Sequence, residues 1–232
     1  MKVKALFISD IHLGSRGCNA SKLLEILNTY KPKEIFIVGD FLDGWLLKRR
    51  WYWKPLFTKV IRKLILLSTI GTKITYVTGN HDDFLRSFTP MQLNPNIRIV
   101  DEAEWAGYFI THGDLYDGVV KLRWLGYIGG LGYELAIIID RFIKKLGYKK
   151  SFSKWLKVTV KDAVKFITDF EQQVAYQAKE KNCIGVICGH IHTPIDKIVR
   201  VGEVPIRYLN CGDWIENNSF IIFDKDFKIY YV

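Results

Sequence analysis

Apolar, β-branched segments of this chain run directly into short polar motifs, and this arrangement constrains the fold more than any other feature. The segments alternate with helical patterns: we expect strands at 3–8, 35–38 and 73–77, and helices at 22–30 and 55–69. Such alternation is typical of βαβ units and a parallel sheet. Ligands of open α/β sheets bind outside the carboxyl ends of the strands. The pattern therefore predicts an α/β fold with its functional side chains at one edge of the sheet.

The second half of the chain departs from this alternation. After a further strand expected at 105–110, the pattern is helical from about 116 to 181, which is too long for a simple connection. We interpret this segment as a helical insertion, or lid, over the active site. Sheet patterns return at 184–187 and in short strands around 198, 207, 221 and 229. With 232 residues and 49% apolar content, the chain is predicted to form a single domain, 1–232, with an insertion at about 116–181.

The charge of the chain favours anionic partners. The net charge is +10, and residues 141–165 alone contain nine Lys or Arg and one acidic residue. Phosphorylated substrates, nucleic acid and an anionic membrane surface all fit this balance. The four cysteines have no CxxC spacing, and the chain opens on a charged strand, so we expect reduced thiols and a cytoplasmic protein. The most apolar stretch, 125–139, is shorter than the roughly 20 residues that span a bilayer.

All five histidines lie in the polar motifs, beside Asp, Asn or Gly. The motifs are Asp10-Ile11-His12, Gly39-Asp40-Phe41-Leu42-Asp43-Gly44, Gly79-Asn80-His81-Asp82, His112-Gly113-Asp114 and Gly189-His190-Ile191-His192. Asp10 and His12 are two residues apart, as are His190 and His192, and residues two apart share a face of extended chain. Carboxylate, amide and imidazole ligands without sulfur suit Mn, Fe, Zn or Co better than Ca. Two such metals about 3.5–4 Å apart activate water and clamp a phosphoryl group. Asp82 and Asp114 are expected to fix the loops by accepting hydrogen bonds from backbone amides.

These five motifs, in this order over residues 7–213, resemble those of the calcineurin-like metallophosphoesterase superfamily. The resemblance implies a four-layer αββα sandwich and direct in-line attack of water on phosphorus. It implies that His81 faces the phosphate, either stabilising the developing charge or protonating the leaving oxygen, and that Asp43 orients its ring. The implied ligands are Asp10, His12 and His192 for one metal, Asn80, His112 and His190 for the other, and Asp40 as the bridge. Manganese is the ion expected at both sites, and iron, zinc or cobalt are the alternatives.

Within the superfamily, the chain is most similar to the UDP-2,3-diacylglucosamine pyrophosphatases of lipid A synthesis. The similarity lies in residues 8–14, 38–45, 166–171 and 210–214, and in the position of the insertion. It implies hydrolysis of the pyrophosphate to UMP and 2,3-diacylglucosamine 1-phosphate by a peripheral enzyme at the inner face of the cytoplasmic membrane. The best-established members carry Arg where this chain has His81. The alternative function is that of a metal-dependent phosphodiesterase or nuclease acting on another nucleotide or on nucleic acid. A noncatalytic scaffold on the same fold is disfavoured, because such proteins lose metal ligands and this chain has all of them.

Two basic segments are candidates for substrate contact. Arg49, Arg50 and Trp51 follow the bridging motif and could hold a nucleotide diphosphate, hold a nucleic-acid backbone with stacked bases, or form a basic surface loop. Lys144 and Lys145 belong to the basic, apolar insertion. That unit could lie on an anionic leaflet, line a groove for acyl chains, or pack on the core with a solvated outer face. The partners expected are a lipid-linked nucleotide-sugar substrate and an anionic membrane, with nucleic acid less favoured.

Overall fold

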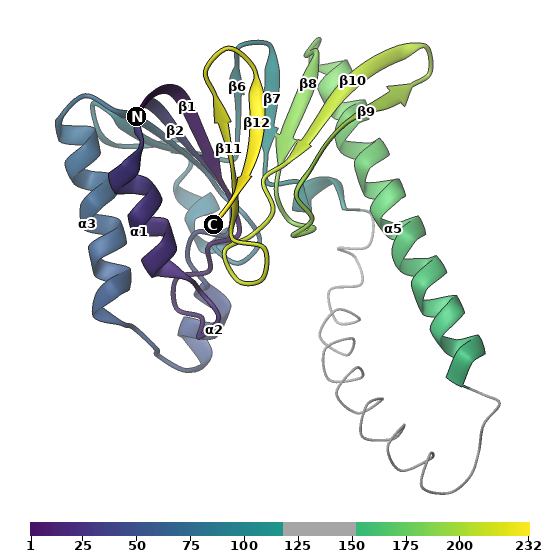
Figure 1. Cartoon of the computed structure of the whole chain (residues 1–232), viewed down its shortest axis with the longest axis horizontal. Helices are drawn as coiled ribbons and strands as arrows, with labels where there is room; N and C mark the ends of the chain where they lie inside the picture. The colour runs from purple at the N-terminus through teal and green to yellow at the C-terminus, as the bar shows by residue number, and fades with distance from the viewer. Residues whose placement is uncertain (118–151) are drawn as a thin grey trace, which may run out of the picture. The chain divides into compact units, whose positions relative to one another are not determined.

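Two mixed β-sheets form the body of the protein (Figure 1). The computed structural model describes the backbone of residues 1–117 and 152–232, and the side chains of residues 1–117 and 166–232. The first sheet has seven strands in the order β12-β11-β1-β2-β3-β5-β4, and the second has five in the order β6-β7-β8-β10-β9. The described residues thus form the mixed α/β architecture that the sequence predicts.

The first sheet is built around four parallel strands. β1 (Lys2–Ile8), β2 (Lys31–Val38), β3 (Lys73–Val77) and β5 (Ile97–Val100) pair in parallel. β4 (Met91–Asn94), β11 (Ser219–Phe223) and β12 (Phe227–Tyr231) complete the sheet with antiparallel pairs. The parallel arrangement brings the carboxyl ends of β1, β2 and β3, and the motifs that follow them, to one edge.

Two amphipathic helices cover one face of this sheet, α1 (Ala20–Thr29) and α3 (Pro55–Thr69) (Figure 1). The Asn19 side chain accepts the Lys22 amide at the start of α1, and Pro55 occupies the first turn of α3, where its missing N–H costs nothing. The apolar stripes of both helices join the buried side chains of the sheet in one core cluster, which includes Leu23, Phe57 and Ile37.

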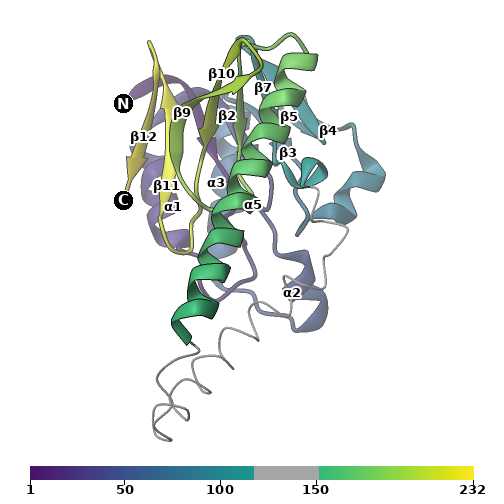
Figure 2. The same cartoon turned by 90° about the vertical axis from the view of Figure 1, so that its right-hand side faces the viewer.

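The second sheet packs against the other face of the first. It consists of β6 (Glu102–Trp105), β7 (Tyr108–Thr111), β8 (Gly185–Cys188), β9 (Ile195–Val201) and β10 (Val204–Asn210). Figure 2 shows β9 and β10 running together as a hairpin. A second core cluster combines Phe7 and Phe36 of the first sheet with Ile110, Ile187 and Leu209 of the second. β7, β8 and β10 are parallel, so the loops after β7 and β8 also emerge at one edge.

The structure corrects several expected elements. The segment 105–110 is not one strand: β6 ends at Trp105 and β7 begins at Tyr108, because Ala106 and Gly107 both adopt positive φ and close a tight hairpin. The sequence patterns also missed the short helix α2 (Gly44–Arg49), the 3-10 turns η1 (Asp83–Phe88) and η2 (Asp114–Tyr116), and the strands β4 and β5.

The chain divides into two compact units, residues 1–114 with 174–232, and residues 115–173. The helix α5 (Phe152–Glu180) belongs to both, and its last turns bury Val174, Ala175 and Ala178 within the unit that contains the sheets. Residues 118–151 of the expected insertion lie outside the described residues. No helix in the described part of the chain is long and apolar enough to span a membrane.

Candidate metal centre

The polar motifs converge at the carboxyl ends of five parallel strands from both sheets. Asp10 and His12 follow β1, Asp40 follows β2, and Asn80 follows β3. His112 follows β7, and His190 and His192 follow β8. Five of the predicted metal ligands have positive φ, between 52° and 71°: Asp10, His12, Asp40, His190 and His192. Left-handed backbone is uncommon for residues other than glycine and is concentrated at functional sites.

Backbone hydrogen bonds connect the first two motif loops and hold these conformations. The amides of Ile11 and His12 both donate to the Asp40 carbonyl, at 3.0 and 2.9 Å, and the Asp10 amide donates to that of Gly39 at 3.2 Å. Asp40 and Asp10 each accept further bonds through their side chains: the His81 amide donates to Asp40 Oδ1 at 2.8 Å, and the His190 amide to Asp10 Oδ2 at 3.1 Å. The loops therefore form a single fixed scaffold.

Three glycines allow the ligand side chains to approach the backbone. A Cβ atom on Gly39 would lie 2.3 Å from the His112 ring, and one on Gly79 would lie 2.2 Å from Asp40 Oδ1. A Cβ atom on Gly189 would lie 2.4 Å from Asp10 Oδ2. Real Cβ atoms essentially never come so close to other atoms. Glycine is therefore required at these motif positions because of space, and at Gly39 also because its φ is +82°.

Asp10, His12 and His192 bring one set of ligand atoms together. The Nε2 atoms of His192 and His12 lie 3.1 and 3.9 Å from Asp10 Oδ1. Burial disfavours the charged His192 ring, but the Asp10 carboxylate outweighs this effect and raises the pKa of His192 to about 9. For Asp10 itself burial acts to raise the pKa, yet the neighbouring imidazoles hold it well below its usual range.

Asp40, His112 and Asn80 form the adjacent set. His112 Nε2 lies 3.3 Å from both Asp40 Oδ2 and Asn80 Oδ1, and its ring centroid lies 5.2 Å from that of His190. His112 Nδ1 donates to the Val38 carbonyl at 3.0 Å, so Nε2 is the ring nitrogen that can bind a metal ion. Despite its burial, the pKa of the metal-free His112 ring is raised well above its ordinary value by Asp40 and Asp10.

The arrangement of these atoms fits divalent cations. Asp10 Oδ1 and His12 Nε2 are buried, and neither makes a hydrogen bond in the structure. His12 Nε2 also lies 3.8 Å from Asp40 Oδ2, so potential ligand atoms of carboxylates and imidazoles face one another. Buried polar atoms without partners are costly, and a cation bound between them removes that cost. Oxygen and imidazole donors without thiolate match Mn, Fe, Zn or Co.

His81 lies beside this centre and is held by two neighbours. Its Nδ1 atom lies 3.1 Å from Asp43 Oδ1, and the Trp45 ring stacks on it with centroids 4.2 Å apart. Asp43 also accepts the Leu46 amide at 3.0 Å at the start of α2, and its Oδ2 atom lies 3.7 Å from His12 Nδ1. One ligand atom each of His12, Asp43 and His81 lies within 4.8 Å of the others, which is close enough for these residues to hold a metal ion. Burial acts to lower the pKa of His81, but the hydrogen bond to Asp43 and the negative charges of Asp40 and Asp43 together outweigh it, and the net shift is upward.

Two buried carboxylates support the loops in different ways. Asp82 accepts the amides of Phe41 and Gly79, at 2.8 and 2.5 Å, as expected from the sequence, and also the Tyr76 hydroxyl. Asp114, in contrast, forms a bidentate pair with the Arg86 guanidinium at 2.8 and 2.9 Å. The expectation of backbone amides for Asp114 was therefore wrong. Arg86 was missed because it lies outside the polar motifs.

An apolar pocket of about 690 Å³ adjoins the centre. Trp45 belongs both to this pocket and to the His81 stack, and Trp51 and Trp53 stack on one another at its rim. The other lining residues are Leu42, Gly44, Leu47, Lys48, Ile61, Asp83 and Phe84. Of the predicted substrate contacts, Trp51 lines this pocket, whereas Arg49 and Arg50 are exposed and do not. Lys144 and Lys145 lie outside the described residues.

Comparisons with known proteins place the chain in a family. UDP-2,3-diacylglucosamine hydrolase of Porphyromonas gingivalis is 25% identical, over 97% of this chain and 95% of that protein. The enzyme of the same name from Aeromonas hydrophila is 24% identical over 95% and 94%. A solved archaeal phosphodiesterase, 15% identical, aligns with 98% of this chain and 99% of its own, with a TM-score of 0.46. The sequence profile of the calcineurin-like phosphoesterases matches residues 3–194. The chain thus belongs to the calcineurin-like phosphoesterase family and is a metal-dependent phosphoester hydrolase.

Proposed function

We propose that this enzyme hydrolyses the pyrophosphate bond of UDP-2,3-diacylglucosamine, releasing UMP and 2,3-diacylglucosamine 1-phosphate. The observation that carries the proposal is the tryptophan-lined pocket beside His81. Its lining is largely apolar, its volume of about 690 Å³ suits a large substituent, and Trp45 connects it to the reacting end of the site. A substrate with both a pyrophosphate and acyl chains needs an apolar pocket next to the metal-binding residues. The names of the two bacterial relatives, which align over nearly their whole length, support the same substrate.

We further propose which residues would bind the two metal ions. Asp10, His12 and His192 would hold one metal, Asn80, His112 and His190 the other, and Asp40 both, with manganese the expected ion. These residues would hold a metal pair that would polarise phosphate oxygens and lower the pKa of water, which would then attack phosphorus in line. The bridging role proposed for Asp40 is supported by its Oδ2 atom, which lies 3.8 Å from His12 Nε2 and 3.3 Å from His112 Nε2.

His81 is proposed as the proton donor to the leaving oxygen. The hydrogen bond to Asp43 fixes the ring at Nδ1 and leaves Nε2 to face the substrate. In the metal-free site, burial acts to lower the pKa of His81, but the Asp43 hydrogen bond and the Asp40 and Asp43 charges raise it, a direction that suits a general acid. Asp43 acts by positioning His81, and the stacked Trp45 restricts the same ring from its face. The enzyme would work at the inner face of the cytoplasmic membrane, where its lipid substrate lies.

The stacked Trp51 and Trp53 rings favour a second candidate, a phosphodiesterase acting on nucleic acid. Trp51 is 74% exposed and stacks on Trp53 at 5.9 Å, and Lys48 lies in the same pocket. Rings and a cation in this arrangement can bind a base and its phosphate. This candidate predicts hydrolysis of single-stranded DNA in preference to a lipid-linked nucleotide sugar.

A substrate screen with the purified enzyme separates the two candidates. UDP-2,3-diacylglucosamine, UDP-N-acetylglucosamine and single-stranded DNA are each assayed with Mn²⁺, Zn²⁺ or Mg²⁺. We expect kcat/KM to be highest for the diacylated substrate, and the Trp45→Ala variant to lose that preference while its metal content is unchanged. Equal rates for the acylated and unacylated sugar nucleotides would contradict the proposed role of the pocket, and faster cleavage of DNA would favour the second candidate.

A further inference from the structure

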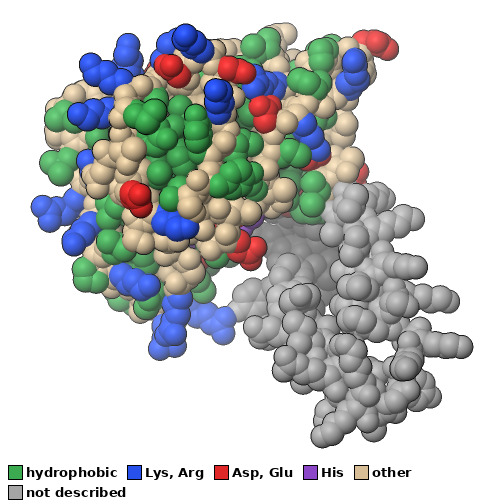
Figure 3. Space-filling model, in the orientation of Figure 1, with side chains coloured by type: hydrophobic (Ala, Val, Ile, Leu, Met, Phe, Trp, Pro, Cys, Tyr) green, Lys and Arg blue, Asp and Glu red, His purple; other side chains and the backbone are tan. Residues whose placement is uncertain are grey.

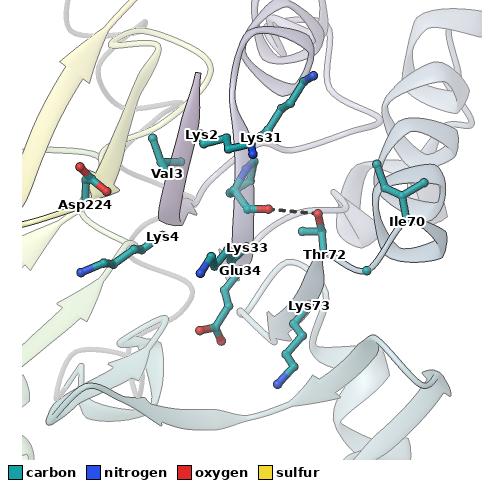
Figure 4. A pocket seen from close by; sticks show the side chains of 12 residues that line it. Lys2, Val3, Lys4, Lys31, Lys33, Glu34, Ile70, Thr72, Lys73 and Asp224 are labelled. Atoms are coloured by element: carbon teal, nitrogen blue, oxygen red, sulfur yellow. Dashed lines mark hydrogen bonds between the residues drawn. The ribbon is translucent and has the colours of Figure 1, made fainter.

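A second hollow, of about 740 Å³, lies at the opposite ends of the parallel strands, where β1, β2 and β3 begin (Figure 4). Five lysines and two carboxylates line it, together with the turn after α3. The charged residues of this lysine hollow are Lys2, Lys4, Lys31, Lys33, Lys73, Glu34 and Asp224. None of them belongs to the metal centre, whose motifs follow the carboxyl ends of the same strands. The lysine hollow is therefore separate from the site of hydrolysis.

The positive charge of the lysine hollow is not balanced by its own carboxylates. One of the two carboxylates, Glu34, accepts a hydrogen bond from the Trp105 indole N–H at Oε1, at 2.8 Å. Lys4 lies over the Phe223 ring, with its ammonium 5.6 Å from the centroid. Within the described part of the chain, Lys2, Lys31, Lys33 and Lys73 form no ion pair, and all four side chains are exposed. Figure 3 shows Lys and Arg side chains gathered around the end of the molecule where β1 and β2 begin.

The strand register places like charges side by side. Lys2 of β1 pairs directly with Lys31 of β2, and like charges at directly opposite positions are destabilising. Lys4 and Lys33 lie two residues further along the same strands. Lys73 of β3 lies opposite Glu34 of β2 in the strand register, but the two side chains form no ion pair. An anion in the hollow would relieve this repulsion between neighbouring lysines.

The shape of the hollow suits a small ligand. Its volume lies within the roughly 300–1,000 Å³ of typical small-molecule sites. At its floor the Thr72 hydroxyl donates to the Pro32 carbonyl at 3.1 Å, which ties the turn after α3 to β2 (Figure 4). The neighbouring Gly71 leaves open space, since a Cβ atom there would meet nothing within 4 Å. The hydrogen bond thus fixes the backbone at the base of the hollow, while the long lysine side chains around it can change rotamer.

We propose that the lysine hollow binds a soluble anion that carries two or more phosphate groups, such as a polyphosphate. Several ammonium groups from three strands can neutralise several phosphates at once, whereas a single phosphate would leave most of them unpaired. A membrane surface fits less well, because docking here would direct the metal centre away from the lipid. It would also press Glu34 and Asp224 towards an anionic leaflet. This binding site is independent of the proposed substrate.

Two variants of the full-length, metal-loaded enzyme test the proposal. The first replaces Lys31, Lys33 and Lys73 with Gln; the control replaces Lys59, Arg62 and Lys228, which are exposed and do not line the hollow. Both lose three positive charges and keep the same metal centre and insertion. Inorganic tripolyphosphate is titrated into each by calorimetry at physiological ionic strength. Melting temperatures near that of the wild type establish that each variant is folded.

We expect the control to bind tripolyphosphate like the wild type, and the hollow variant to bind it at least about tenfold more weakly. Tripolyphosphate should also protect Lys33 and Lys73 of the wild type from acetylation, a measurement that needs no variant. Equal affinity of the two variants, absence of saturable binding to the wild type, or unchanged acetylation would each overturn the proposal. Cosedimentation with phosphatidylglycerol vesicles that is lost in the hollow variant, without tripolyphosphate binding, would assign the hollow to a lipid surface and refute the soluble ligand.

Discussion

Replacing Gly79 with Ala should disable the enzyme without removing any functional group. The new Cβ atom would lie 2.2 Å from Asp40 Oδ1 and 2.6 Å from the Asp40 amide nitrogen, whereas an ordinary contact begins at 3.4 Å. Asp40 or the loop after β3 must therefore move by about 1.2 Å. Rotation of the carboxylate does not suffice, because the backbone of Asp40 is also too close. A misplacement of about 1 Å at a reacting centre costs about a hundredfold in rate, or about 2.7 kcal/mol.

The assay is hydrolysis of bis(p-nitrophenyl) phosphate with Mn²⁺, combined with measurement of bound metal. We expect Gly79→Ala to lower kcat/KM about a hundredfold and to reduce metal occupancy. Gly202→Ala is the matched control: Gly202 has a φ of +63°, and a Cβ atom there would meet nothing within 4 Å. The control should lose about 1 kcal/mol of stability and keep its activity. Wild-type rate and metal content in Gly79→Ala would refute the assignment of Asp40 to the centre.

Three further predictions concern individual side chains. His81→Gln should lower turnover by about a hundredfold or more with unchanged metal content, and loss of metal would instead make His81 a ligand. Arg86→Met leaves the buried Asp114 carboxylate unpaired and should cost about 3 kcal/mol of unfolding free energy by urea denaturation; a cost near zero would contradict the bracing role of the pair. Because the pKa of the metal-free His192 ring is raised to about 9, its contribution to stability is full below about pH 6.5 and lost as the pH rises through about 9. The melting temperature of the metal-free enzyme should fall over that window, and a flat profile would argue against the pair of His192 and Asp10.

The strand-end position of the motifs could be predicted because it depends on local patterns. The boundaries of α3 and β3 agree with the sequence, since Pro55 and the runs of apolar residues define them. The close approach of His12, Asp10 and His192 depends on parallel pairing within two different sheets. The order of the elements indicates this pairing, but it does not give the distances between the side chains. The positive φ of Asp10 and Asp40 is only weakly indicated by residue type, because Asp is enriched in this region but seldom adopts it. These conformations are held by hydrogen bonds between loops that are distant in sequence.

Other features follow from tertiary contacts alone. Trp45 was part of a recognised motif, but its stacking on His81 depends on the start of α2 at Gly44, whose amide donates to the His81 carbonyl at 2.9 Å. The lysines of the hollow are spread over residues 2–73 and come together only because β1, β2 and β3 begin at the same edge. No local pattern connects Lys73 with Lys2.

The number of metal ions bound per chain is the most direct test of the candidate centre. Metal-free enzyme is titrated with Mn²⁺ by calorimetry, and bound metal is counted by elemental analysis, for the wild type and for Asp40→Ala. If Asp40 connects two adjacent ion sites, the wild type should bind two ions per chain, and Asp40→Ala should lose at least one of them together with hydrolysis of the activated diester. A single ion in the wild type, or two ions and full activity in Asp40→Ala, would contradict the two-metal centre.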